Sequence, residues 1–198
     1  MDLRSGAAFW PINSGLIHNY PALESDEQAD VLVLGAGITG ALMTKRLSRL
    51  GLNVVALDRR DVARGSTSAS TAMLQYEIDT HLIDLRRMVG RARADRAYLL
   101  CLEAVEGLET LSREVGEEQS FKRKQSLYYA STRRDLSALR EEYQARRTLG
   151  IALEFLGPSE LRERFGLRQS GALLSRVAAE VDPYRLTHAL LKRAQEMG

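Results

Sequence analysis

The chain has 198 residues, of which 44% are hydrophobic and 27% charged, and its net charge is +2. This composition suits one domain, or a large and a small subdomain, and the small net charge is not typical of nucleic-acid binding. The single cysteine, Cys101, excludes an internal disulfide and a cysteine metal site, and it falls on an apolar helical stripe that predicts a packing role. The histidines have no ligand spacing, so no metal site is expected; they are His18, His81 and His188.

The N-terminal residues 1–29 predict an extended arm laid over a domain, because they are rich in turn-forming residues and lack periodicity. Trp10 is expected to anchor this arm. Neither a signal-peptide core nor an apolar run of membrane-spanning length is found in the sequence, which predicts a cytoplasmic protein without a membrane span. Arginines cluster between residues 86 and 96, but interleaved acids favour a solvated helix face over a nucleic-acid surface.

The stretch Asp30–Arg59 reads as a strand, a glycine-rich turn, a helix and a second strand. Residues 31–34 are short, apolar and partly β-branched, which predicts a buried parallel strand. From Ile38 the apolar residues take helical spacing, and Gly51 ends the helix. The predicted inner face of this helix is Ala41, Leu42, Leu47 and Leu50. A second apolar run follows and ends on Asp58.

Three glycines, Gly35, Gly37 and Gly40, give the G-x-G-x-x-G pattern of a dinucleotide-binding turn. The first permits the turn, the second leaves room for a pyrophosphate, and the third lets the helix pack close to the sheet. The turn is also expected to hold Gly37 in a conformation that glycine adopts easily. The helix N-terminus offers N–H groups and a positive dipole end to phosphates. Asp58, 23 positions after Gly35, suits a ribose hydroxyl and argues against NADP.

Small hydroxyl side chains dominate residues 61–74, directly after the strand that ends on Asp58. One interpretation is a flexible polar loop. The other is a loop whose hydroxyl and N–H groups bind phosphate, ribitol or flavin atoms. Its position directly after the acid favours the second interpretation.

The rest of the chain predicts a mixture of helices and strands. Helices are expected at about 80–90, 92–115, 132–149, 158–166 and 183–198, and strands at about 121–130, 151–156 and 171–181. Thr132 with Asp135 predicts a capping box at one helix start. Asp182 and Pro183 predict the N-cap and first turn of the last helix.

These motifs resemble the N-terminal part of the FAD-dependent oxidoreductases of the D-amino acid oxidase and glycine oxidase superfamily. The resemblance spans nearly the whole chain, and its most specific parts are Asp30–Gly40, Asp58, Gly65–Leu74 and Val181–Pro183. It implies an α/β fold, with a Rossmann-like FAD-binding domain and the start of a substrate-domain sheet.

The resemblance also implies a division of the chain. Residues 1–29 would form the arm, and residues 30–198 an incomplete FAD-binding oxidoreductase domain. The segment at about 119–181 would include strands of the substrate subdomain.

The resemblance also implies an FAD site, to which the turn, the acid and the hydroxyl-rich loop all contribute. The residues implied are Gly35, Gly37, Ile38, Thr39 and Gly40 at the pyrophosphate, Asp58 and Arg59 at the adenosine ribose, Ser66 and Thr67 at the phosphate and ribitol, and Thr71, Ala72 and Met73 at the flavin ring. The family oxidises the C–N bond of an amine or amino acid by hydride transfer to flavin. The expected partner is therefore a small-molecule amine or amino acid, and no catalytic residue is assigned.

The family pattern includes further strands, a substrate-binding sheet and a second glycine-containing FAD segment, which these 198 residues lack. We therefore expect a truncated chain or fragment that is inactive by itself. Two alternatives remain open, namely a nicotinamide-binding dehydrogenase domain and a non-catalytic remnant. The hydroxyl-rich loop favours FAD, because a nicotinamide domain would usually continue into another βα unit.

Overall fold

A computed structural model describes residues 6–197 of the chain. The described residues form two compact units. The first unit holds the chain up to Ala72, residues Thr110–Phe121 and the chain from Val181 on, and the second holds Met73–Glu109 and Lys122–Glu180. Each unit combines helices with strands, so the fold is α/β as the sequence predicts.

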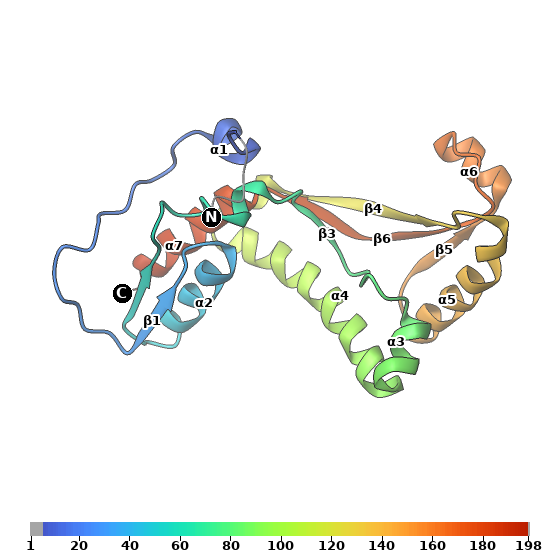
Figure 1. Ribbon diagram of the computed structural model, residues 1–198, viewed down its shortest axis with the longest axis horizontal. Helices are drawn as coiled ribbons and strands as arrows, with labels where there is room; N and C mark the ends of the chain where they lie inside the picture. Colours follow the sequence, from blue (N-terminus) through green and yellow to red (C-terminus); the bar gives the residue numbers. More distant parts are fainter. Residues whose placement is uncertain (1–5, 198) are drawn as a thin grey trace. The chain divides into compact units, whose positions relative to one another are not determined.

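The first unit contains the strand–turn–helix–strand element that the sequence predicts (Figure 1). β1 (Val31–Leu34) leads into α2 (Ile38–Ser48), and β2 (Val54–Leu57) returns beside β1. The two strands pair in parallel, with Val31 opposite Val54 and Leu34 opposite Leu57. Because they are parallel, the turn after β1 and the end of β2 lie at the same edge. The predicted Rossmann-like unit is confirmed. Its first strand is not buried as predicted, because Leu32 and Leu34 are 54% and 77% exposed and β2 holds no fully buried residue. Among the described residues this sheet has only the two strands, so no neighbouring strand covers them.

The inner face of α2 differs from the prediction. Leu50, expected on that face, is 61% exposed, and the helix ends before it. The buried residues of α2 are Ala41, Thr44, Lys45 and Ser48. Three of these four residues, Ala41, Thr44 and Ser48, have small side chains, which lets α7 (Pro183–Gln195) pack directly against α2. The prediction for Leu50 is wrong because this distant helix, rather than the local apolar spacing, determines which face is buried.

The start of α7 agrees with the sequence. Asp182 Oδ1 accepts hydrogen bonds from the backbone N–H groups of Tyr184 (2.9 Å) and Arg185 (3.0 Å). Pro183 occupies the first turn, where its missing N–H is not needed. Asp182 Oδ2 also accepts a hydrogen bond from Ser14 Oγ (2.8 Å), which ties the N-terminal arm to this helix start.

The arm contains a short helix that the sequence does not predict, α1 (Phe9–Ser14). After it, residues 15–29 run without helix or strand to the start of β1 (Figure 1). Trp10 Nε1 donates a hydrogen bond to the carbonyl oxygen of Ser70 (2.9 Å), so Trp10 anchors the arm as expected.

His188 is a buried side chain on α7. It is 3% exposed, and neither ring nitrogen has a hydrogen-bond partner among the described residues. The ring packs edge-on against Tyr184 (centroids 4.6 Å apart) and faces Tyr20 of the arm at 6.5 Å. Burial lowers the pKa of His188 to about 4, with a contribution from the charges of His18 and Arg64.

We expect the first unit to lose stability as the pH falls from about 6.5 to about 4. The ordinary pKa of histidine is 6.5 and that of His188 in the folded chain is about 4, so the unfolded chain binds the proton more tightly. The stabilisation is complete above pH 6.5 and its loss is on the order of 3 kcal/mol. Urea unfolding at pH 7.5 and 4.5, followed by Trp10 fluorescence, measures the loss. The variant His188→Leu should show a smaller pH dependence, and an unchanged dependence would contradict this assignment.

The second unit is a sheet centred on β6 (Ala172–Val181). β3 (Met73–Gln75) pairs antiparallel with the C-terminal part of β6, with Met73 opposite Glu180. β5 (Leu153–Leu156) pairs antiparallel with its N-terminal part. β4 (Phe121–Tyr129) is also a neighbour of β6. The three strands predicted after residue 120 are therefore confirmed, whereas β3 falls where the sequence predicts a loop.

The remaining helices lie close to their predicted positions. They are α3 (Leu82–Val89), α4 (Arg91–Glu114), α5 (Leu136–Thr148) and α6 (Pro158–Phe165), with 3₁₀ turns at Ser66–Ala69, Glu118–Ser120 and Arg133–Asp135. The capping box of Thr132 and Asp135 is confirmed, and it opens the 3₁₀ turn that leads into α5. Within residues 6–197, no helix combines the length and the apolar character needed to cross a membrane.

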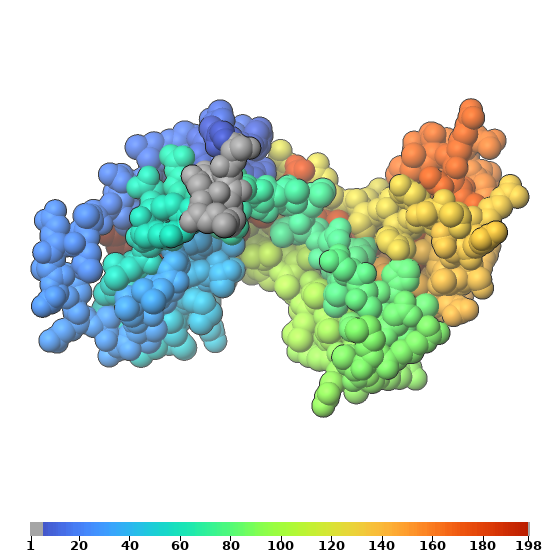
Figure 2. Space-filling model, viewed as in Figure 1, coloured from blue at the N-terminus to red at the C-terminus, as the bar shows by residue number. Residues whose placement is uncertain are grey.

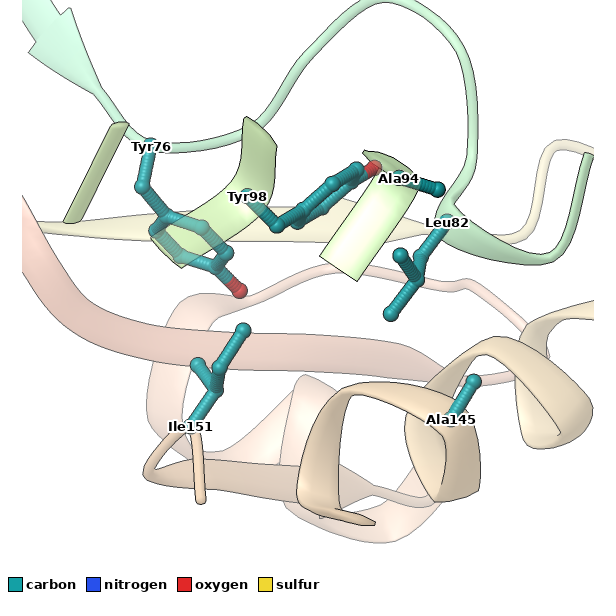
Figure 3. Packing of buried hydrophobic residues seen from close by; sticks show 6 residues of the cluster. All are labelled: Tyr76, Leu82, Ala94, Tyr98, Ala145 and Ile151. Atoms are coloured by element: carbon teal, nitrogen blue, oxygen red, sulfur yellow. The ribbon is translucent and has the colours of Figure 1, made fainter. Parts of the chain in front are cut away.

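The core of the second unit gathers side chains from the segment after β3, from α3, α4 and α5, and from the turn between α5 and β5 (Figure 3). Its buried residues are Tyr76, Leu82, Ala94, Tyr98, Ala145 and Ile151. Cys101 packs against this cluster, which confirms its predicted packing role. A buried ion pair lies in the same region, where Arg146 Nε donates to Glu142 Oε1 (2.6 Å).

Candidate functional site

The glycine turn follows β1 at the edge where β2 also ends. Gly35 has φ +107°, a conformation that favours glycine, and its N–H donates to the carbonyl oxygen of Leu57 (2.7 Å). Gly37 is the N-cap residue of α2, with φ −82° and ψ −175°. This is extended backbone open to any residue, so the expectation of a special conformation at Gly37 is wrong. The conformational requirement lies at Gly35.

Gly40 lies in the first turn of α2 and faces the turn that precedes it. A Cβ built on Gly40 would lie 1.8 Å from the carbonyl oxygen of Gly35 and 3.5 Å from Val33 Cγ1. The helix therefore begins in direct contact with the backbone of the turn. A Cβ on Gly37 would meet Thr67 Oγ1 at 3.0 Å, which is a tight contact with a side chain.

Asp58 connects the end of β2 to the glycine turn. Its side chain is exposed, and Oδ2 accepts a hydrogen bond from the N–H of Ala36 (2.8 Å). Oδ1 accepts a second hydrogen bond from the N–H of Arg60 (3.0 Å). The carboxylate thus lies at the mouth of the turn and holds the loop between Gly35 and Gly37 in place.

A cleft of about 540 Å³ opens beside this carboxylate. It is lined by Leu23, Leu34, Gly35, Leu57, Asp58, Arg59 and Arg60. Its size falls within the range of about 300–1,000 Å³ that small-molecule and cofactor pockets occupy. It combines apolar walls with one carboxylate and two guanidinium groups, which suits a molecule with both a ring and charged or hydroxyl groups.

The hydroxyl-rich loop reaches the N-terminus of α2 through Thr67. Thr67 is buried in the 3₁₀ turn, and its Oγ1 accepts a hydrogen bond from the N–H of Ile38 (3.0 Å). This N–H is one of the groups at a helix start that lack a partner within the helix. Ser66, which precedes Thr67, and Thr39, which follows Ile38, are both exposed. The loop is therefore ordered against the helix start, which disfavours the interpretation as a flexible polar segment.

The end of the loop has an unusual backbone. Ala72 is buried and has φ +61°, a left-handed conformation that costs a non-glycine residue roughly 1–2 kcal/mol. Its carbonyl oxygen accepts a hydrogen bond from the N–H of Val181 (3.2 Å), which fixes this conformation. Thr71 before it is exposed. Met73 after it is 71% exposed and begins β3 in the second unit.

The structure brings most of the predicted residues together. The glycine turn, Asp58 and Thr67 are linked by the contacts described above, and Arg59 lines the cleft beside Asp58. Sequence reasoning assigned no site role to four residues of the cleft, Leu23, Leu34, Leu57 and Arg60. Leu23 lies in an aperiodic arm, so no local pattern could have placed it there.

These residues fit a dinucleotide cofactor. α2 has no side-chain cap from its own N-cap residue, since that residue is Gly37, so the helix start is open to a phosphate once the Thr67 hydroxyl moves. A carboxylate at the end of β2 suits ribose hydroxyl groups. The fit rests on the missing Cβ atoms at Gly37 and Gly40 and on the position of Asp58.

Among proteins of known sequence, the chain is similar to a Bacillus subtilis protein, YhfW, named as a Rieske 2Fe-2S iron-sulfur protein. The two are 24% identical over 190 residues, which are 96% of this chain and 36% of YhfW. A second relative is one of the component chains of the anaerobic glycerol-3-phosphate dehydrogenase of Escherichia coli K12. The identity is 27% over 175 residues, which are 87% of this chain and 29% of that relative. The chain therefore spans about a third of the length of these relatives.

Among solved structures, the chain is similar to the L-amino acid deaminase from Proteus vulgaris, with a TM-score of 0.73 and 19% identity. The likeness covers 93% of this chain and 41% of the deaminase. The glycine oxidase from Geobacillus kaustophilus has a TM-score of 0.68 and 21% identity, over 87% of this chain and 46% of the oxidase. At these identities the likenesses show the fold.

The family model described as "DAO: FAD dependent oxidoreductase" matches residues 30–198, which is most of the chain. The match includes the glycine turn, Asp58, the hydroxyl-rich loop and the start of α7, on which the sequence resemblance rests. This chain belongs to the DAO family of FAD-dependent oxidoreductases.

Proposed function

We propose that the first unit binds the adenosine and pyrophosphate part of FAD, and that the chain serves an enzyme that oxidises the C–N bond of an amine or amino acid. The cofactor site rests on one observation: the end of β2 and the hydroxyl-rich loop both bond to the backbone around the start of α2, next to a cleft. Asp58 Oδ2 bonds Ala36 N–H, Thr67 Oγ1 bonds Ile38 N–H, and the cleft opens beside Asp58.

Each group has a specific role in this proposal. Gly37 leaves the approach to the helix start open, and the N–H groups there bind the pyrophosphate, with Thr67 moving from Ile38 to the cofactor. Asp58 accepts hydrogen bonds from the adenosine ribose, and Arg59 lies beside it. Ser66, Thr71, Ala72 and Met73 are proposed on the ribitol and flavin side. When bound, FAD supplies the group that accepts a hydride from the substrate.

The substrate class rests on the structural relatives. The deaminase and the glycine oxidase act on amino acids by their names, and both share the fold over most of this chain. A second candidate is the oxidation of a carbon that bears a hydroxyl group, because one relative is named as part of a glycerol-3-phosphate dehydrogenase. A nicotinamide-binding domain is not favoured, since the matching family is FAD-dependent.

The cofactor site is tested with Asp58→Asn. Asparagine keeps one oxygen acceptor but loses the charge, so we expect ADP and FAD affinity to fall by about 1–3 kcal/mol while the chain stays folded. Calorimetric titration measures the affinities, and a thermal melt without ligand measures folding. Equal affinities of wild type and variant would contradict the ribose role. If the wild type binds neither ligand, the proposed FAD site is contradicted.

The activity of the chain by itself is tested by adding amino acids, amines and glycerol 3-phosphate to the FAD-loaded chain with an artificial electron acceptor. The chain covers less than half of the deaminase and oxidase structures. We therefore propose that these 198 residues alone give no turnover beyond that of free FAD. Turnover of an amine would overturn this expectation and support C–N oxidation, and turnover of glycerol 3-phosphate would support the second candidate.

A further inference from the structure

The cleft beside Asp58 has one wall that does not come from the strand–turn–helix–strand element of β1, α2 and β2. Leu23, in the arm before β1, lines the cleft together with Leu34 at the end of β1 and Asp58 at the end of β2. Leu23 is 56% exposed and Leu34 is 77% exposed, so both present apolar surface to solvent. Figure 2 shows the arm, in blue at the left of the view, separated by a hollow from the rest of its unit.

The arm is held on both sides of Leu23. On its N-terminal side, Tyr20 faces the ring of His188 at 6.5 Å. On its C-terminal side, the carbonyl oxygen of Gln28 accepts a hydrogen bond from Asn53 Nδ2 (3.0 Å), and Asp30 Oδ2 accepts one from Asn53 N–H (2.9 Å). The residues between these contacts form a strap, and Leu23 within it lines the cleft.

We propose that this strap, residues 20–28, forms the outer wall of the adenine site, with Leu23 packed on the adenine ring. The inference rests on the proposed FAD site and adds to it a binding residue outside the βαβ element. With the ribose at Asp58, the adenine extends away from the glycine turn into the part of the cleft bounded by Leu23. Apolar contact on a ring face stabilises binding by removing both surfaces from water.

This arrangement has a direct consequence for the arm. A ligand that fills the cleft contacts Leu23 and so holds the strap closer to the unit. Glu24 and Glu27 lie in the strap and are exposed, which makes them substrates for a glutamate-specific protease. Bound nucleotide should therefore slow cleavage after Glu24.

The test is calorimetric titration of ADP into the wild-type chain, Leu23→Ala and Leu16→Ala. ADP is chosen because it contains the adenine, ribose and pyrophosphate without the flavin. Leu16 is a matched control, since it is an arm leucine that is 72% exposed and does not line the cleft. We expect Leu23→Ala to weaken ADP binding by about tenfold and Leu16→Ala by less than about twofold. A thermal melt of each variant verifies that it is folded.

The same samples are digested with the glutamate-specific protease with and without ADP. We expect ADP to slow cleavage after Glu24 in the wild type, and to a smaller extent in Leu23→Ala. Three results would each overturn the proposed role of the strap. They are an unchanged ADP affinity in Leu23→Ala, an equal loss of ADP affinity in both leucine variants, and cleavage that ADP does not slow. Absence of ADP binding by the wild type would instead overturn the FAD site itself, and the strap with it.

Discussion

Replacement of Gly40 by alanine is expected to destabilise the first unit by more than about 3 kcal/mol and to abolish ADP binding. A Cβ on Gly40 would lie 1.8 Å from the carbonyl oxygen of Gly35. Both atoms are fixed to the backbone, so no change of rotamer relieves the overlap, and the turn or the start of α2 must move. The displaced N–H groups are those proposed to hold the pyrophosphate, so folding and binding should fail together.

Gly37→Ala is the matched control. Its Cβ would meet Thr67 Oγ1 at 3.0 Å, a side-chain atom that can shift. We therefore expect a free energy of unfolding within about 1 kcal/mol of wild type, together with weaker ADP binding because the methyl group occupies the approach of the phosphate. Urea unfolding followed by Trp10 fluorescence and titration of ADP measure both quantities. A Gly40→Ala chain as stable as wild type would contradict the contact between Gly40 and Gly35.

The sequence predicts the βαβ element well because its determinants are local. A short apolar strand, a turn that needs glycine at Gly35 and a helix start without a side-chain cap all lie within ten residues. The carboxylate of Asp58 follows at the end of the next strand, and parallel pairing brings it back to the turn. The start of α7 was predictable for the same reason, since Asp182 bonds N–H groups two and three residues away.

Features that depend on distant partners were not predictable in this way. β3 has three residues, too few to show a period, and it is a strand because β6 pairs with it about a hundred residues later. The inner face of α2 is decided by α7, and a cleft wall comes from Leu23 in the aperiodic arm. The left-handed backbone of Ala72 is held by a hydrogen bond from Val181, which no local pattern in the loop signals.

The buried ion pair of the second unit is expected to have the other large effect. Arg146 is 1% exposed and Glu142 is fully buried, and their side chains bond at 2.6 Å. Glu142 Oε1 and Oε2 also accept the N–H groups of Leu82 (2.8 Å) and Ile83 (3.0 Å) at the start of α3. One carboxylate therefore compensates the charge of an arginine and caps a helix. Burial lowers the pKa of Arg146, but interactions with Tyr76 and Glu142 raise it above its ordinary value, so the guanidinium stays charged.

Arg146→Met should destabilise the second unit by about 3–5 kcal/mol, because it leaves the Glu142 carboxylate buried without a counter-charge. Arg147→Met is the control, since Arg147 is exposed on the same helix and a surface substitution should change stability by less than about 0.5 kcal/mol. Replacing both Glu142 and Arg146 with apolar residues should not restore the wild-type stability, because the N–H groups of Leu82 and Ile83 would then lack their acceptor. Native-state hydrogen exchange of these two amides measures the stability of the second unit. Trp10 fluorescence measures the unfolding of the first unit in the same samples. Exchange at Leu82 and Ile83 as slow in Arg146→Met as in the wild type would show that the buried carboxylate holds α3 without its arginine.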